Sequence, residues 1–130
     1  MLLEFKTKNY KSFVEEASFS MVAAPKQKGL DYSLMKTKIK GKEIKGLSSS
    51  VIYGPNAAGK TNIIGAMDVL RAIVLRGNIR NSEEKSSPNP AAAALELIPN
   101  NNEMESKPVC FEIEFYEEDG ENHKFKIHYE

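Results

Sequence analysis

The sequence lacks the features that would crosslink the chain or anchor it in a membrane. Its 130 residues contain no tryptophan and a single cysteine, Cys110, which excludes an internal disulfide and a zinc site built from cysteines. No stretch approaches the roughly 20 apolar residues of a membrane span. The N-terminus also lacks the basic and apolar segments of a secretory signal. We therefore expect a cytoplasmic protein that makes no contact with a membrane.

An excess of charge of either sign is also missing. Eighteen basic and eighteen acidic residues give a formal net charge of zero, so global charge gives no argument for binding nucleic acid or a membrane surface. Five lysines do gather in one short stretch, where a solvated strand or loop face is favoured over a basic binding patch: Lys36, Lys38, Lys40, Lys42 and Lys45. The length suits one domain or part of one.

The first 22 residues have the pattern of two short strands. Apolar and polar residues alternate over residues 2–8, which predicts a half-buried strand whose inner side chains are Leu3, Phe5 and Thr7. Residues 9–13 predict a turn. Alternation returns over residues 17–22, so we expect a second strand that runs antiparallel to the first.

The middle of the chain changes from a loop to a strand and then to a helix. Residues 24–46 are rich in lysine and predict a loop with at most a short strand near Ile39. The β-branched and aromatic residues at 50–53 predict a buried strand. From 60 to 76 the period becomes helical, with Gly77 as the C-terminal cap. The apolar stripe of this helix consists of Ile63, Ala66, Met67, Leu70, Ile73 and Val74.

The last third of the chain predicts a loop followed by a β-hairpin. Residues 78–90 are polar and contain two prolines, which predicts a loop, and the alanines of 91–95 could add one helical turn. Alternation over 109–115 and again over 125–129 predicts two paired strands. Residues 118–121, Glu-Asp-Gly-Glu, supply the turn between them.

The eight residues between the predicted strand and helix match the phosphate-binding P-loop pattern G-x-x-x-x-G-K-[S/T]. They are Gly54, Pro55, Asn56, Ala57, Ala58, Gly59, Lys60 and Thr61. Such a loop surrounds a phosphate chain with backbone N–H groups, and the N-terminus of the helix adds further donors. Gly54 permits the tight turn after the strand, and Gly59 lets the main chain approach the β-phosphate. We therefore expect the chain to bind a nucleoside triphosphate, ATP with magnesium.

The same motif predicts the roles of two side chains. The Lys60 ammonium reaches the β- and γ-phosphates, and the Thr61 hydroxyl offers a ligand to Mg²⁺. Hydrolysis also needs a carboxylate that holds the metal and a residue that positions water. The best acidic stretch, 117–119, reads instead as a solvated hairpin turn. Beyond Lys60 no catalytic residue is identified, and we expect negligible turnover from these 130 residues alone.

Four stretches resemble one branch of ABC-type ATPases. Residues 3–13 are similar to its opening strand and Asn-aromatic-basic-Ser-aromatic turn, Asn56 is similar to its loop asparagine, and Thr61-Asn62-Ile63-Ile64 is similar to its helix start. The predicted C-terminal hairpin also fits. The chain resembles the N-terminal part of the RecF/SMC-like branch, above all bacterial AAA family ATPases of the phage-defence and restriction-associated kind. Ala57 departs from the glycine that many ABC-type loops have there.

The resemblance implies a mixed α/β fold, the N-terminal lobe of a P-loop NTPase. Antiparallel strands at 1–22 and a hairpin at 109–130 would surround the strand, P-loop and helix of 50–76. It implies that two copies sandwich two ATP molecules and that hydrolysis moves a nuclease, a DNA- or RNA-binding element or another effector. In relatives the signature motif, the magnesium-holding carboxylates and the switch histidine lie far downstream of the P-loop. We therefore expect these 130 residues to be part of a longer protein.

The resemblance leaves three questions open. Asn62 follows the motif and joins the predicted nucleotide site, whereas Lys11 and Ser12 either approach the phosphates or belong to an ordinary exposed turn. A regulatory module that senses ATP without turnover is the main alternative function. A P-loop kinase fits less well because two strands precede the loop, and a GTPase would need an Asn-Lys-x-Asp motif, which the sequence lacks.

Overall fold

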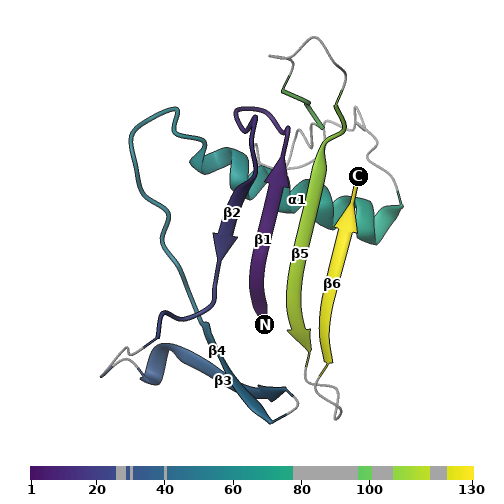
Figure 1. The fold of residues 1–130 in the computed structure, drawn as a ribbon. Helices are drawn as coiled ribbons and strands as arrows, with labels where there is room; N and C mark the ends of the chain where they lie inside the picture. Colours follow the sequence, from purple (N-terminus) through teal and green to yellow (C-terminus); the bar gives the residue numbers. More distant parts are fainter. Residues whose placement is uncertain (26–28, 30, 40, 78–96, 101–106, 118–122) are drawn as a thin grey trace, which may run out of the picture.

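The computed structural model describes residues 1–25, 29, 31–39, 41–77, 97–100, 107–117 and 123–130. They form a mixed α/β fold with two antiparallel sheets and one long helix (Figure 1). The larger sheet has the order β2-β1-β5-β6, and the smaller one pairs β3 with β4. The elements are β1 (Leu2–Lys8), β2 (Ala17–Ser20), the 3-10 turn η1 (Asp31–Ser33), β3 (Leu34–Ile39), β4 (Lys42–Leu47), α1 (Lys60–Arg76), β5 (Cys110–Glu117) and β6 (His123–Tyr129).

Strand β1 lies inside the larger sheet, between β2 and β5. Its alternation is confirmed, because Leu3, Phe5 and Thr7 are buried on one face. The predicted antiparallel partner is also confirmed as β2, although it ends at Ser20, two residues before the predicted end. On the other side β1 pairs with β5, so the first strand joins the C-terminal hairpin.

The predicted C-terminal hairpin is confirmed, and both strands extend two residues further toward the turn than predicted. β5 and β6 are antiparallel, with Ile113 opposite Ile127 and Phe115 opposite Phe125. The rings of the Phe115–Phe125 pair stack with centroids 5.3 Å apart, a cross-strand contact that stabilises the pair. The predicted loop at 78–90, helical turn at 91–95 and hairpin turn at 118–121 lie outside the described residues.

The opposite face of the sheet presents alternating charges to solvent. Lys126 is 2.9 Å from a Glu112 oxygen, and Lys124 is 2.6 Å from Glu114. Lys6 lies within 3.7 Å of Glu112 from the neighbouring strand. The hydrogen bond from Lys126 is the main cause that lowers the pKa of Glu112 below its ordinary value. This face is therefore a solvated network of cross-strand ion pairs, and the core lies on the other side.

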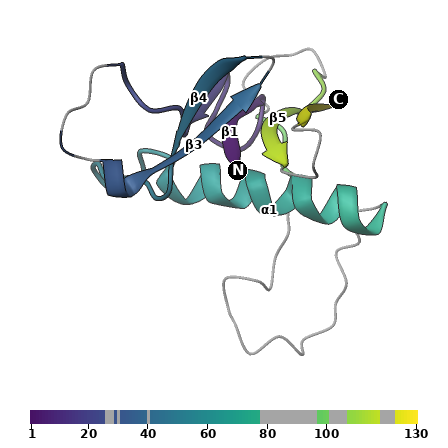
Figure 2. The same cartoon turned by 90° about the horizontal axis from the view of Figure 1, so that it is seen from below.

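Helix α1 covers that other side of the larger sheet, as the view from below shows (Figure 2). The core is formed by apolar residues of the sheet, the helix and the turn after β1: Phe5, Tyr10, Ile63, Ala66, Val69, Leu70, Val109 and Phe111. Phe111 is fully buried and contacts the Phe5 ring at 6.4 Å and the Tyr10 ring at 5.7 Å between centroids. These aromatic contacts join β1, β5 and the turn after β1 beneath the helix.

The predicted helix bounds are confirmed at Lys60 and Arg76, and Gly77 caps the end with its N–H donated to the Ile73 carbonyl. The predicted apolar stripe is only partly correct. Ile63, Ala66 and Leu70 are buried, but Met67 and Ile73 are half-buried and Val74 is 54% exposed. Val74 is exposed because the last turn of the helix extends past the edge of the sheet at β6 (Figures 1 and 2). Val69 takes a core position instead.

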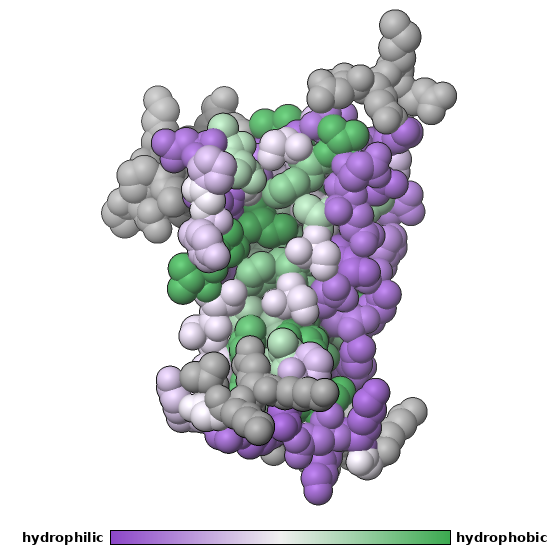
Figure 3. Space-filling view, turned by 60° about the vertical axis from the view of Figure 1, so that its left-hand side comes forward, coloured by the Kyte–Doolittle hydropathy of each residue, from purple (hydrophilic) through white to green (hydrophobic). Residues whose placement is uncertain are grey.

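The predicted strand at 50–53 is wrong. The segment is not part of a sheet, and the side chains of Val51 and Tyr53 are 83% and 90% exposed. β-Branched and aromatic residues favour a strand where a neighbour accepts its backbone hydrogen bonds, and no strand of the described ranges runs beside this segment. Only Ile52 packs against the core. Figure 3 shows the molecule with the left-hand side of Figure 1 turned forward, where a band of hydrophobic residues is bordered by hydrophilic ones.

The predicted short strand near Ile39 is confirmed as part of β3, but the loop predicted around it is wrong, because β3 and β4 form a hairpin over residues 34–47. Lys36 lies opposite Lys45 and Thr37 opposite Ile44. Lysine is depleted in strands, so the many lysines of this segment concealed the two strands in the sequence. Within the lysine cluster, Lys36 contacts Asp31 at 2.5 Å and Lys45 contacts Glu43 at 3.2 Å. The hydrogen bond with Asp31 raises the pKa of Lys36, and the same bond lowers that of Asp31. These pairs fit a solvated strand face.

Replacing Leu70 with alanine tests the packing of α1 on the sheet. Leu70 is 2% exposed, so the variant should lower the free energy of unfolding by about 2–5 kcal/mol. Val74→Ala on the same helix is the control and should change it by less than about 0.5 kcal/mol, because that side chain is exposed. Urea denaturation followed by circular dichroism measures both. Equal effects would contradict the described orientation of the helix.

Candidate functional site

The P-loop connects the extended segment before residue 54 directly to α1. Three of its residues have positive φ angles: Gly54 (154°), Ala57 (65°) and Gly59 (83°). Ala57 therefore adopts the left-handed region that a glycine would occupy at lower cost. The loop from 54 to 58 is exposed, and the Ala58 N–H points to the Pro55 carbonyl at 3.4 Å. The result is an open, tightly curved loop that ends on the first turn of the helix.

The N-terminus of α1 has the properties of an anion-binding site. Gly59 is its N-cap and supplies no side-chain cap. Its carbonyl accepts the N–H groups of Asn62 at 2.9 Å and Ile63 at 3.1 Å. The amides before Asn62 lie at the positive end of the helix dipole, where an anion is favoured. The unpaired N–H groups at the start of the helix therefore lie at the end of the loop, where they can bind an anion.

Lys60 lies across the mouth of this loop. Its side chain is half-buried, and Nζ donates to the carbonyl of Gly54 at 2.9 Å and to that of Pro55 at 2.6 Å. The ammonium is therefore held beside the helix N-terminus rather than extended into solvent. Thr61 follows in the first turn with an exposed side chain. The Lys60 ammonium and the N–H groups of the first turn of α1 thus lie close to the loop.

The turn after β1 packs directly on this region. The side-chain amide of Asn62 donates to the Ser12 hydroxyl at 2.7 Å, so the start of α1 is bonded to the turn. A Cβ placed on Gly59 would lie 3.0 Å from the Phe13 ring and 3.1 Å from Ser12 Oγ. Of the two turn residues predicted from sequence, Ser12 is therefore at the loop. The Lys11 ammonium lies over the Tyr10 ring, 5.7 Å from its centroid.

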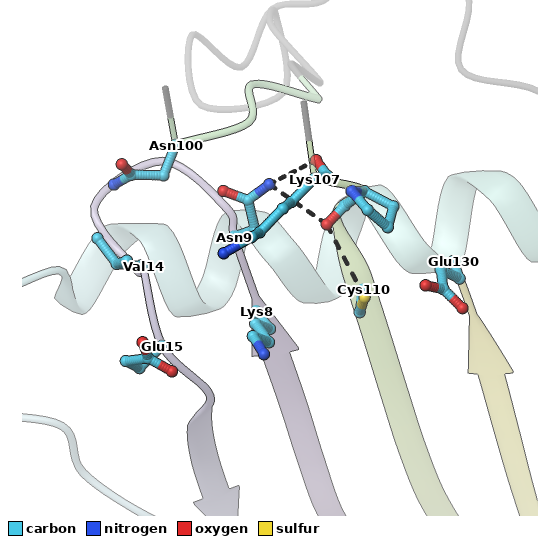
Figure 4. A pocket seen from close by; sticks show the side chains of 9 residues that line it. Lys8, Asn9, Val14, Glu15, Asn100, Lys107, Cys110 and Glu130 are labelled. Atoms are coloured by element: carbon cyan, nitrogen blue, oxygen red, sulfur yellow. Dashed lines mark hydrogen bonds between the residues drawn. The ribbon is translucent and has the colours of Figure 1, made fainter. Parts of the chain in front are cut away.

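Sequence reasoning missed two asparagines that hold the turn. Asn9 has φ 53° and donates its side-chain amide to the carbonyls of Lys107 at 2.7 Å and Pro108 at 3.3 Å (Figure 4). Asn100 donates its side-chain amide to the Lys11 carbonyl at 2.6 Å. The tolerance of asparagine for positive φ was the one available signal at Asn9. Nothing in the pattern around Asn100 indicates its role, because the contact spans 89 residues.

A cavity of about 180 Å³ lies beside these asparagines. Figure 4 shows its wall, which includes Lys8, Glu15 and Cys110. Burial, the largest cause, and the Glu130 carboxylate raise the pKa of the Cys110 thiol above its ordinary value, so the thiol stays protonated near neutral pH. In the part of the chain that is described, no three His, Cys, Asp or Glu side chains gather as they would around a metal ion.

The residues at the loop fit a polyphosphate with a bound divalent cation. The helix N-terminus, which has no side-chain cap, supplies N–H donors, Lys60 supplies positive charge, and Thr61 has an exposed hydroxyl in the first turn. Mixed α/β architecture, P-loop and helix start together define a nucleotide-binding protein of the P-loop ATPase type.

Comparison with protein families agrees with this class. Residues 49–128 match the family described as "AAA domain, putative AbiEii toxin, Type IV TA system". The chain belongs to this AAA-domain family. Comparisons with curated proteins and with solved structures found no match. Across the described residues, no helix combines the length and the apolar character that crossing a bilayer requires.

Proposed function

We propose that the chain binds ATP as its magnesium complex through residues 54–62. The observation that supports this most directly is the position of Lys60, whose ammonium lies at the mouth of the loop beside the uncapped start of α1. The backbone N–H groups of residues 56–59 surround the β-phosphate, since Pro55 has no N–H, and Lys60 contacts the β- and γ-phosphates. Thr61 contributes its hydroxyl to the metal, and Asn62 fixes the first turn through Ser12.

The bound metal would neutralise phosphate charge, and the residues of this chain hold the nucleotide in place. Turnover also needs a metal-holding carboxylate and a group that positions water. We propose that motifs elsewhere and a second copy of the protein supply these groups, as in the RecF/SMC-like heads that the sequence resembles. Hydrolysis would then drive a nucleic-acid-processing or defence effector.

Chelation and substitution at Thr61 test the proposed magnesium complex. EDTA should weaken ATP binding by the wild-type chain, because the cation links the phosphates to Thr61. Thr61→Ala should remove most of this magnesium dependence and lower affinity about tenfold, as expected for loss of a contact to a charged group. Thr61→Ser keeps the hydroxyl and is the matched control. Titration of a fluorescent ATP analogue measures all three. Affinity that is unchanged by both EDTA and Thr61→Ala would contradict the proposal.

Release of phosphate separates an ATPase head from a sensor. We expect residues 1–130 alone to bind ATP without measurable release, and a longer form that contains the missing groups to hydrolyse it. A sensor would bind ATP in both forms and hydrolyse it in neither. Phosphate release by residues 1–130 that disappears in Lys60→Ala would contradict the placement of the catalytic groups elsewhere.

A further inference from the structure

We propose that Asn100 is a positioning residue for the P-loop, acting through the turn formed by residues 9–13. The Asn100 side chain holds this turn, and the Ser12 and Phe13 side chains of the turn lie against Gly59. The inference rests on the proposed function only for the identity of the ligand, since the geometry that carries it is internal to the chain.

The turn needs support from outside because its own backbone is unfavourable. Asn9 has φ 53° and Lys11 has φ 48°, so two residues that are not glycine lie in the left-handed region within three positions. Such residues persist where surrounding contacts determine the conformation. Within the turn, Tyr10 and Phe13 exchange backbone hydrogen bonds of 3.0 and 2.8 Å. These two bonds close the turn on itself.

Besides the bonds from the Asn9 side chain to the carbonyls of Lys107 and Pro108, residues 98–100 support the turn from outside. The Asn100 side-chain amide donates to the Lys11 carbonyl at 2.6 Å, and its backbone N–H donates to the Asn9 carbonyl at 3.2 Å. The Lys11 N–H donates in turn to the Ile98 carbonyl at 2.8 Å. Both strained residues are thus bonded to this segment. The bond from the Asn100 side chain is the one that a substitution can remove without changing the backbone.

The far side of the same turn contacts the P-loop. Ser12 accepts the hydrogen bond of Asn62 at 2.7 Å, and Phe13 and Ser12 approach the Gly59 Cβ position at 3.0 and 3.1 Å. Gly59 is both the residue before the helix and the N-cap of α1. A shift of the turn therefore changes the position of Gly59 and, with it, of the first turn of α1. Asn100 therefore acts on the geometry of the P-loop through the turn that it holds.

Backbone amide resonances of Gly59 and Lys60 test this link without nucleotide. We expect Asn100→Ala to shift both resonances, and Asn100→Asp, which keeps the size but loses the donor, to shift them as well. Ser18→Ala is the matched control, because it removes a side-chain hydrogen bond of 2.8 Å on the exposed face of the sheet. It should leave both resonances in place. Unchanged resonances in both Asn100 variants would overturn the proposal.

Nucleotide affinity provides the second readout. Asn100→Ala should weaken ATP binding about fivefold to tenfold, in the range of one lost hydrogen bond, measured well below the unfolding temperature. Ser12→Ala should have a similar effect. The double variant should lose less than the product of the two changes, since both act through the turn. Fully independent effects would overturn the proposal. If the wild-type chain bound no ATP, the proposed function would fail, and the Gly59 and Lys60 resonances would still decide the positioning role.

Discussion

Replacing Lys60 with alanine is expected to weaken ATP binding more than about a hundredfold. The ammonium lies beside the helix start, where it can contact two phosphate groups, and each charge-assisted hydrogen bond contributes about 1.5–3 kcal/mol. Two such bonds total about 3–6 kcal/mol, and each 1.4 kcal/mol is a factor of ten in affinity. Isothermal titration calorimetry of the chain with ATP and magnesium measures the change.

The controls must show that the loss of ATP affinity in Lys60→Ala is caused neither by unfolding nor by the loss of one positive charge alone. The two carbonyls that Lys60 contacts belong to exposed residues, so the variant should unfold at nearly the wild-type temperature. Lys42→Ala removes an exposed lysine of β4 outside the P-loop and should leave affinity unchanged. If Lys60→Ala and Lys42→Ala bound ATP equally well, residues 54–62 would not be the nucleotide site.

Replacing Gly59 with alanine should have the largest effect on stability of any glycine in the loop. An added Cβ would be strained twice, by φ 83° and by contacts of 3.0 Å with the Phe13 ring and 3.1 Å with Ser12 Oγ. The left-handed conformation costs about 1–2 kcal/mol and overpacking about 1–3 kcal/mol. We therefore expect the free energy of unfolding to fall by about 2–5 kcal/mol in urea denaturation.

Gly77 provides a matched control at the other end of the same helix. It has φ 72°, and a Cβ there would meet nothing within 4 Å. Gly77→Ala should therefore cost only the conformational part, about 1–2 kcal/mol. The change in the unfolded chain is the same for both substitutions and cancels in the comparison. Equal costs for the two variants would mean that the turn does not press on Gly59.

Sequence patterns predicted the elements whose signals are local. The strand at 2–8, the helix at 60–76 and the C-terminal hairpin each have a clear period, and the P-loop has a fixed spacing. The helix stripe was less accurate, because Val74 and Val69 exchange roles according to where the sheet ends. Periodicity gives the apolar side of a helix but not the extent of the surface that covers it.

The misses are cases in which a distant partner determines the outcome. The hairpin at 34–47 was hidden by lysines that are tolerated because acidic neighbours pair with them. The segment at 50–53 has strand-forming residues, yet strand formation depends on a neighbour that composition does not reveal. Asn100 holds a turn that lies 89 residues earlier in the chain. Distances of this kind leave no local signature.

The pairing of β1 with β5 has a consequence for how the molecule folds. The N-terminal amine and the carbonyl of Met1 both bond to the backbone of Tyr116, which lies 115 residues later. Contacts between such distant residues require closing a long loop, and they slow folding relative to local contacts. During synthesis the P-loop and α1 emerge before β5 exists. The turn at the start of α1 gains its support only from residues 98–100 and 107–108, and the sheet beneath the helix is complete only when β6, which ends at Tyr129, has left the ribosome.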